Sequence, residues 1–159
     1  MIYKSITSVN KIIRIFKIIL FSKKTILPPK NKSILIFDIN GSKIIGDLIL
    51  GHKEFNILPS RYETINIFVL CLSIFKMKKY KKYSYLNTYI YLTKPKYILT
   101  YIDTSSRLLM IKKNFEQIKY IFFQNGNKQN RWLNMFKEKH NLDTNLDYYF
   151  THQEDLTRF

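Results

Sequence analysis

The chain alternates between short apolar runs and segments with helical spacing. Each run has the length of a strand, is rich in β-branched and aromatic residues, and is followed by polar or turn-forming residues. The runs span residues 33–37, 55–58, 97–102, 118–123 and 146–150. Strands that alternate with helices are typical of α/β proteins, so the pattern predicts about five mostly parallel strands with helices on both faces of the sheet.

The clearest unit of this pattern spans residues 96–126. Its first apolar run is followed at residues 103–106 by Asp-Thr-Ser-Ser, which are residue types that cap helix N-termini. A helical period follows, and a second apolar run ends at residues 124–126, Gln-Asn-Gly. Strand, helix and strand over this length describe a βαβ crossover. We therefore expect a single Rossmann-like domain over residues 31–159.

The intervening segments predict three more helices and one loop. Ser42 is placed to cap a helix over residues 43–50, and a continuous apolar run favours a buried helix over residues 65–75. The tyrosine-rich segment 83–92 predicts a helix whose tyrosines cover the core. Residues 76–82 are rich in lysine and are expected to form a solvated basic loop.

Residues 1–30 are predicted to precede the domain as an amphipathic helix and a linker. Between residues 9 and 21, basic residues recur at every third position among apolar ones. Such a helix packs on the domain or lies in a membrane interface, and the sequence leaves both open. Pro28, Pro29 and four lysines make residues 22–32 an extended linker.

The C-terminal segment is predicted to contain a polar loop and two helices. Residues 127–134 are polar and long enough for a functional loop, and Trp132 and Phe136 anchor a short helix. Thr151 begins a further helix with a capping box. A helix that opens a few residues before the end of the chain suggests that more protein follows.

The net charge of +16 indicates an anionic partner. No nucleic-acid-binding motif accompanies the dispersed lysines, so nucleic acid is the least favoured partner, and an anionic lipid surface or a nucleotide-sugar is favoured. Cys71 is the single cysteine and lies in an apolar run, so we expect it to be buried. No apolar run has the roughly 18 residues that a membrane span needs. These features predict a cytoplasmic protein.

The candidate chemistry lies in polar residues at strand ends. The three histidines are far apart and no His/Cys cluster with ligand spacing occurs, so neither a metal nor another cofactor is expected. The carboxyl ends of parallel strands meet at one edge of a sheet, where Asp38, Arg61, Asp103 and residues 124–126 are expected to converge. Structural roles remain open as well: Asp103 as a helix cap, residues 125–126 as a turn, and Arg61 as a surface charge.

Four pieces of the chain occur in a distinctive order. They are Ile34–Asp38 followed by Gly41, Ile57-Leu58 leading to Arg61, Lys94-Pro95-Lys96 before a strand that ends at Asp103, and Ile121–Gly126. In this order they resemble a bacterial family of surface carbohydrate (surface polysaccharide) biosynthesis proteins, which look like glycosyltransferases with two Rossmann-type domains. The resemblance runs from about residue 9 to residue 150, and the chain is similar to the N-terminal half of that family.

The resemblance implies transfer of a sugar or sugar-phosphate from a nucleotide-activated donor to a growing surface glycan. Asp103 would act as the general base on an acceptor hydroxyl, and Arg61 would bind a phosphate or an acidic sugar. The polar side chains after the run 118–123 would bind acceptor hydroxyls. The substrate-binding set would be Asp38, Gly41, Arg61, Gln124, Asn125 and Gly126.

The expected partners follow from this scheme. The acceptor would be a glycan or a lipid-linked molecule, reached at the cytoplasmic face of the cell membrane through peripheral contact with anionic lipid. A nucleotide-sugar would bind only together with the second Rossmann-type domain, which is expected to be missing here, so the chain alone is expected to be inactive. Two other hypotheses remain open: a non-catalytic truncated or split-gene product that binds a glycan or partner subunit, and a basic nucleic-acid-binding module.

Overall fold

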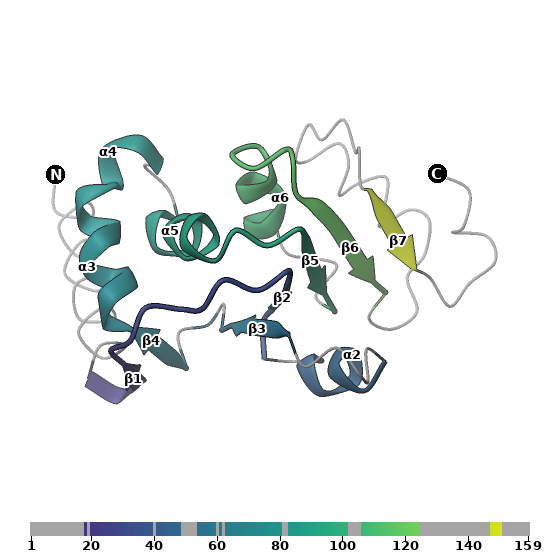
Figure 1. The fold of residues 1–159 in the computed structure, drawn as a ribbon, viewed down its shortest axis with the longest axis horizontal. Coiled ribbons are helices and arrows are strands. Elements are labelled where there is room, and N and C mark those ends of the chain that lie inside the picture. The colour runs from purple at the N-terminus through teal and green to yellow at the C-terminus, as the bar shows by residue number, and fades with distance from the viewer. Residues whose placement is uncertain are drawn as a thin grey trace, which may run out of the picture.

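Two parallel β-sheets and the helices α2 to α6 make up the described part of the computed structural model (Figure 1). The described residues are 18, 20–39, 41–48, 54–59, 61, 63–80, 83–101, 106–124 and 147–150. The predicted loop at 127–134 and the predicted helices around Trp132 and after Thr151 lie outside these residues.

The larger sheet has five strands, all parallel, in the order β3-β2-β5-β6-β7. They are β2 (Ile34–Phe37), β3 (Phe55–Leu58), β5 (Tyr97–Thr100), β6 (Lys119–Phe123) and β7 (Tyr148–Phe150). β2 pairs on both sides, with Ile36 opposite Ile57 on β3 and Leu99 on β5. The order along the chain therefore reverses at β2, because β3 lies on one side and the later strands on the other. The predicted α/β class and the parallel strands are confirmed.

A second, smaller sheet was not expected from the sequence. β1 (Lys23–Thr25) pairs in parallel with β4 (Thr64–Asn66). The predicted linker over residues 22–32 is therefore wrong at β1, and the predicted helix over 65–75 begins two residues late, at Ile67. Every residue of β1 is exposed, so this strand lacks the apolar pattern from which a strand is predicted.

The helices correspond to the predicted ones apart from one addition. They are α2 (Ser42–Leu48), α3 (Ile67–Phe75), α4 (Met77–Tyr80), α5 (Ser84–Thr93) and α6 (Ser106–Lys112). α3 begins where the Asn66 side chain accepts a hydrogen bond from Val69 N–H at 3.0 Å. α4 replaces the expected basic loop over residues 76–82, because its Tyr80 is buried against the core while its lysines remain outside.

The predicted N-terminal helix over residues 9–21 is described only at its end. Ile18, Leu20 and Phe21 are helical, and Ile18 packs against the main core. The remaining residues of that segment, with its basic face, lie outside the described part of the chain.

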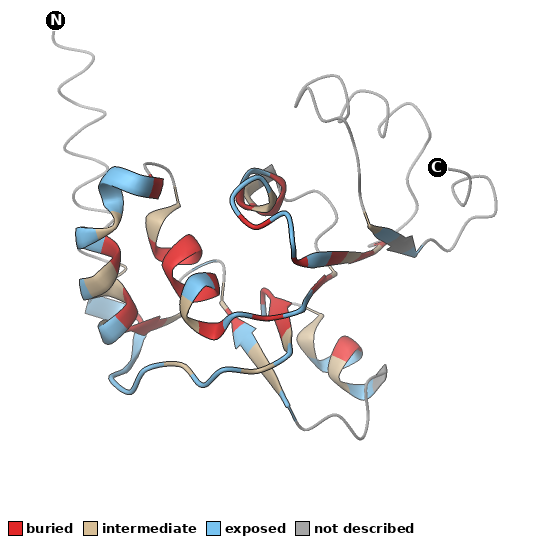
Figure 2. Ribbon diagram, turned by 45° about the horizontal axis from the view of Figure 1, so that its top comes forward, coloured by how far each residue is buried: buried red, intermediate tan, exposed pale blue. Residues whose placement is uncertain are grey.

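The pleat of the larger sheet divides the core into two layers. Figure 2 shows buried residues on the strands of this sheet and on the helices α2 and α5. Leu35 and Phe37 face the layer formed with α3, α5 and α6, whereas Ile36 faces the layer formed with Ile45 of α2. Figure 1 shows α2 on the opposite side of the sheet from α5 and α6. In the described residues, helices therefore cover both faces, as predicted, and Tyr85 and Tyr89 of α5 are buried in the core.

The Asp147 side chain links the start of β7 to β6 and α6 by hydrogen bonds. Its carboxylate accepts hydrogen bonds from Tyr120 N–H at 2.9 Å and from the ammonium groups of Lys112 at 3.0 Å and Lys119 at 3.3 Å. Burial raises the pKa of Asp147, but the Tyr120 N–H and the two lysines lower it by more, so the net pKa lies below the ordinary value. The ionised carboxylate is thus the form that stabilises the fold.

Replacing this carboxylate is expected to destabilise the protein. D147N should lower the free energy of unfolding by about 1–3 kcal/mol at neutral pH, because it weakens hydrogen bonds to a charged group. The exposed Asp47 of α2 provides the matched control, and D47N should change stability by less than about 0.5 kcal/mol. Urea unfolding followed by circular dichroism measures both values.

The same contact gives a pH dependence with a defined sign. Because the folded pKa of Asp147 is depressed, its contribution is present above the unfolded value, about 3.9, and is lost as the pH falls through the folded pKa. The unfolding free energy of the wild type should therefore drop more steeply below about pH 4 than that of D147N. Parallel curves for the two proteins would contradict this assignment.

Candidate functional site

Four of the predicted site residues lie at the carboxyl edge, the edge of the larger sheet at which its parallel strands end. Asp38 follows β2, Gly41 begins the turn to α2, and Gln124 follows β6. Arg61 lies two residues beyond Pro59, which follows β3. Asp103, Asn125 and Gly126 lie outside the described residues, so their part in a site stays a prediction.

Asp38 is a buried carboxylate paired with a solvent-facing guanidinium. Its side chain is 0% exposed, and its Oδ2 lies 3.5 Å from Nε of Arg61, whose side chain is 57% exposed. The backbone N–H of Asp38 donates to Leu58 O at 2.8 Å, which extends the pairing of β2 with β3 by one residue. A buried carboxylate is costly unless it is paired, so Asp38 fixes Arg61 at this edge.

The backbone of Asp38 is also unusual. Its φ of 82° lies in the left-handed region, which L-residues other than Asn and Asp rarely adopt. Such conformations cost about 1–3 kcal/mol and are concentrated at functional sites. The strand end is therefore turned sharply at the residue that holds Arg61.

Gly41 allows the turn after β2 to pack against β5. Its φ is +79°, and a Cβ built on it would clash with the side chain of Tyr101, the residue that follows β5. No side chain fits in that space. The sequence indicated a turn here, and the structure adds the close contact with Tyr101 as the reason that glycine is required.

Gln124 occupies the same edge further along the sheet. It is buried, and its backbone N–H donates to Phe150 O at 2.8 Å, which joins the ends of β6 and β7. Because β5 lies between β2 and β6, Gln124 is two strand spacings from Asp38, or roughly 10 Å.

A cavity of about 460 Å³ lies next to the part of the carboxyl edge where Asp38 follows β2, and its described lining residues do not include Asp38 or Arg61. Its lining residues come from the ends of β2 and β3, from the smaller sheet with the segment after β1, and from α5. They are Thr25, Leu27, Pro29, Ile39, Ile57, Pro59, Thr64, Asn66, Tyr85 and Tyr89. Ile39 is the neighbour of Asp38 in sequence, so the cavity and the ion pair share one part of the carboxyl edge.

The polar groups of this cavity are fixed by hydrogen bonds. Asn66 N–H donates to the Tyr85 hydroxyl at 2.9 Å, and the Asn66 side-chain amide donates to Thr25 Oγ1 at 3.1 Å and to Leu27 O at 2.7 Å. Burial, with a smaller contribution from Tyr85, raises the pKa of Tyr89 to about 12, so its phenol is neutral at physiological pH. The cavity thus combines apolar walls with a few oriented polar groups, as ligand sites do.

Sequence reasoning did not find this cavity. Its wall depends on the pairing of β1 with β4, two exposed or short strands about forty residues apart whose apolar pattern is weak. The tyrosine-rich helix was the available signal, but tyrosines at helical spacing predict core packing, and Tyr85 and Tyr89 serve both purposes.

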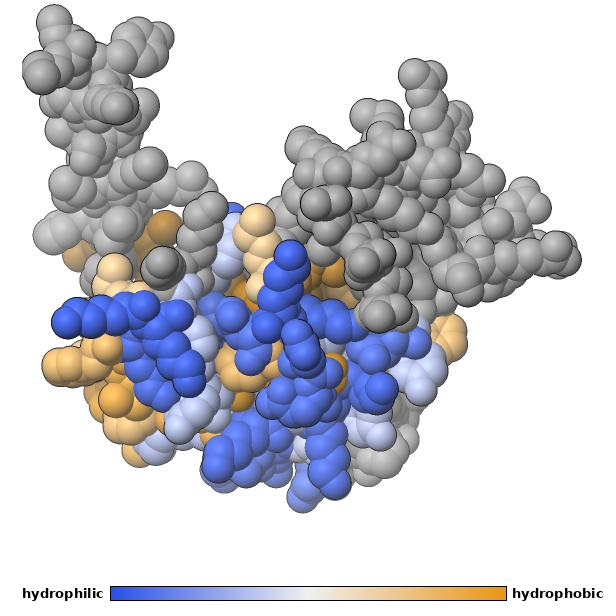
Figure 3. All heavy atoms as spheres, turned by 90° about the horizontal axis from the view of Figure 1, so that it is seen from above, coloured by the Kyte–Doolittle hydropathy of each residue, from blue (hydrophilic) through white to orange (hydrophobic). Residues whose placement is uncertain are grey.

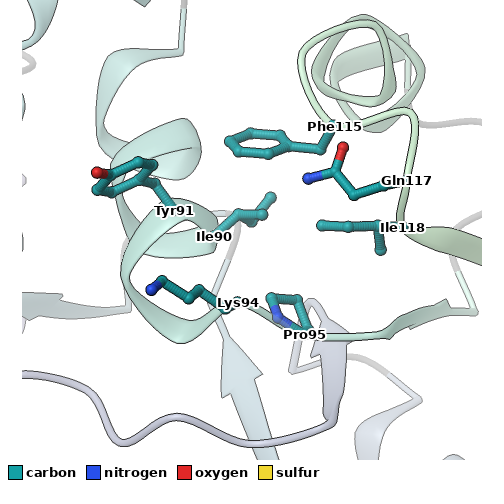
Figure 4. Close-up of a pocket in the computed structure, with 7 residues that line it drawn as sticks. All are labelled: Ile90, Tyr91, Lys94, Pro95, Phe115, Gln117 and Ile118. Atoms are coloured by element: carbon teal, nitrogen blue, oxygen red, sulfur yellow. The ribbon is translucent and has the colours of Figure 1, made fainter.

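A second cavity, of about 310 Å³, lies at the opposite, amino edge of the sheet (Figure 4). Lys94 and Pro95 line it just before β5, and Gln117 and Ile118 line it just before β6, facing Ile90, Tyr91 and Phe115. Its walls are the joint between α5 and the turn after α6. Among its described lining residues, Tyr91, Lys94 and Gln117 carry polar side-chain atoms. This cavity therefore has fewer polar groups for a ligand than the carboxyl-edge cavity.

The expectation that Cys71 is buried is wrong. Cys71 is exposed on α3. α3 is apolar on nearly all sides, so the position of a residue within the run does not tell which face it occupies.

Among the described residues, no three His, Cys, Asp or Glu side chains are grouped so that they could hold a metal ion. Over the same residues, every helix is too short or too polar to cross a membrane. Comparisons with protein-family models, with curated proteins and with solved structures find no match to this chain.

The two described glycines of this region give a paired prediction. G41A should lower the free energy of unfolding by about 1–3 kcal/mol, because alanine meets both the positive φ and the Tyr101 side chain. G46A in α2 should raise it by about 0.5–1 kcal/mol, because its Cβ would lie 3.7 Å from Phe55, an ordinary contact, in a helical backbone. Chemical denaturation tests both, and equal effects would show that the Gly41 turn does not pack as described.

Proposed function

We propose that the chain is the acceptor-binding part of a glycosyltransferase-like enzyme of surface polysaccharide biosynthesis. The acceptor, a sugar or sugar-phosphate on a growing glycan, binds at the carboxyl edge of a Rossmann-like sheet. The observation that carries this proposal is the buried Asp38 paired with the solvent-facing Arg61 beside a cavity of about 460 Å³.

The position of the pair in the sheet supports a ligand site. In open parallel α/β sheets, ligands bind outside the carboxyl ends of the strands, at the point where the strand order reverses. Here that point lies between β2 and β5. Asp38 follows one of these strands and Tyr101 the other, and Gly41 packs against Tyr101. Arg61 and the cavity extend the site from there along β3.

The side chains available there suit an acidic sugar. A guanidinium presents paired N–H donors that match a phosphate or carboxylate, and Asp38 orients the guanidinium of Arg61. The neighbouring cavity lies within the 300–1,000 Å³ range of small-molecule sites. Its lining combines apolar side chains with polar ones, among them Asn66, Tyr85 and Tyr89, as small-molecule sites do.

The transfer itself is assigned by resemblance. Asp103 takes the proton of the acceptor hydroxyl while that oxygen attacks the anomeric carbon of the donor sugar and the nucleotide departs with the bonding electrons. Gln124, Asn125 and the backbone at Gly126 hold acceptor hydroxyls. The donor site belongs to the second Rossmann-type domain of the family that this chain resembles. The reaction takes place on the cytoplasmic side of the membrane.

Binding of sugar phosphates tests the proposal. Isothermal titration with hexose 1-phosphates and N-acetylhexosamine 1-phosphates should give a saturable signal with at least one of them. R61A should weaken that binding by about 10- to 100-fold, because a charged hydrogen bond contributes about 1.5–3 kcal/mol. R61K should weaken binding by less than R61A does, because lysine keeps the positive charge but lacks the paired N–H donors of the guanidinium.

The control is the exposed Lys113, which lies after α6 toward the amino edge. K113A removes one positive charge without touching the carboxyl edge and should leave binding within about twofold. Equal losses in R61A and K113A would mean that the anion is attracted only by the overall charge. Absence of binding to every sugar phosphate would contradict the acceptor site.

A further inference from the structure

α3 exposes its largest apolar side chains. Ile74 is 59% exposed and Phe75 is 82% exposed, and Phe68 and Cys71 are exposed on the same helical face, three and four positions apart. Met77, the first residue of α4, continues this apolar surface and is also exposed. We call these five residues the α3–α4 stripe.

The two buried residues of α3 are smaller than its exposed phenylalanine and isoleucine residues. Val69 and Ser73 are the residues of the helix that are buried, and the Ser73 hydroxyl donates to Leu70 O at 2.7 Å. Ser73 O in turn accepts from the hydroxyl of Ser84 on α5. A small polar residue is therefore inside while phenylalanine and isoleucine are outside, an arrangement that packing of the fold does not require.

Lysines surround the stripe. Lys76, Lys78 and Lys79 alternate with its C-terminal residues, and Nζ of Lys76 lies 3.2 Å from the ring centroid of Tyr91. Residues 64–102 contain seven lysines and no aspartate or glutamate. Figure 3 shows hydrophobic and hydrophilic surface side by side at the end of the molecule where α3 and α4 lie.

We propose that the α3–α4 stripe and its lysines dock on an anionic phospholipid surface. The apolar side chains enter the interface between headgroups and acyl chains, and the lysines contact the headgroup phosphates. A nucleic acid would use the lysines and leave Phe75 and Ile74 in water, whereas lipid satisfies both parts of the surface. The absence of acidic residues over 64–102 favours a partner that is uniformly negative, as such a lipid surface is.

Vesicle binding tests the docking surface. The full chain should sediment with vesicles of equal parts phosphatidylglycerol and phosphatidylcholine, but not with phosphatidylcholine alone. F75S/M77S and K78E/K79E should each lower the partition coefficient at least about tenfold. Raising the salt to about 0.5 M should weaken binding of the wild type.

Matched controls come from exposed residues elsewhere. M110S on α6 removes a half-exposed apolar side chain, and K43E/K113E makes the same charge change as K78E/K79E. M110S should leave the partition coefficient unchanged, and K43E/K113E should lower it by less than about threefold. Circular dichroism checks that each variant is folded.

The single cysteine gives a second readout on the unsubstituted chain. A polarity-sensitive fluorophore attached to Cys71 should shift to shorter wavelength on anionic vesicles and be quenched by lipids that carry a quencher near the headgroups. Vesicle binding that F75S/M77S leaves intact, or a stripe buried by self-association in sedimentation velocity with no vesicle binding, would overturn the proposal. None of these residues belongs to the proposed acceptor site, so that outcome would leave the proposed function standing.

Discussion

β2 pairs in parallel with β3 on one side and with the central strand β5 on the other, and so joins the edge strand β3 to the rest of the larger sheet. Leu35, Ile36 and Phe37 are fully buried, and they alternate between the two layers of the core. Apolar burial on both faces is the condition under which a parallel sheet is stable. The turn that leaves β2 must then pass close to β5, which explains the glycine at position 41.

The burial of β2 also determines where the Asp38–Arg61 pair lies. The last three residues of β2 are buried, and Asp38, which follows them, is buried as well. Its carboxylate needs a cation, and Arg61 from the segment after β3 supplies one while extending into solvent. Removing Arg61 would leave the buried carboxylate uncompensated, so this pair differs from an ordinary surface ion pair. Its value lies in presenting an oriented guanidinium beside a cavity.

Much of the fold was predictable from sequence, and the failures share one cause. All five strands of the larger sheet are apolar runs, so each can be recognised in the sequence, although Ile57 of β3 and Tyr148 and Phe150 of β7 are exposed. β1 is exposed at every position, and α4 is lysine-rich, so neither carries a local apolar signal. Both form because distant segments pair or pack: β1 with β4, and Tyr80 with the core.

The candidate site, too, was predictable from the sequence only in part. The strands of a parallel sheet end at the same edge, so the positions of Asp38, Arg61 and Gln124 at one edge were predictable from the apolar runs. The neighbouring cavity was not, because its wall is the small sheet. The exposure of Cys71 could not be predicted either, because the periodicity of a nearly all-apolar helix does not distinguish its buried face from its exposed face.

The most direct test of the central claim, that the carboxyl edge binds a sugar phosphate, is a map of the bound ligand by nuclear magnetic resonance. Titration of the isotope-labelled chain with N-acetylglucosamine 1-phosphate should shift the backbone amides around Asp38, Gly41 and Arg61, together with those lining the cavity at Asn66 and Tyr89. Shifts confined to the amino edge, around Lys94 and Gln117, or spread evenly over the lysines, would contradict the claim.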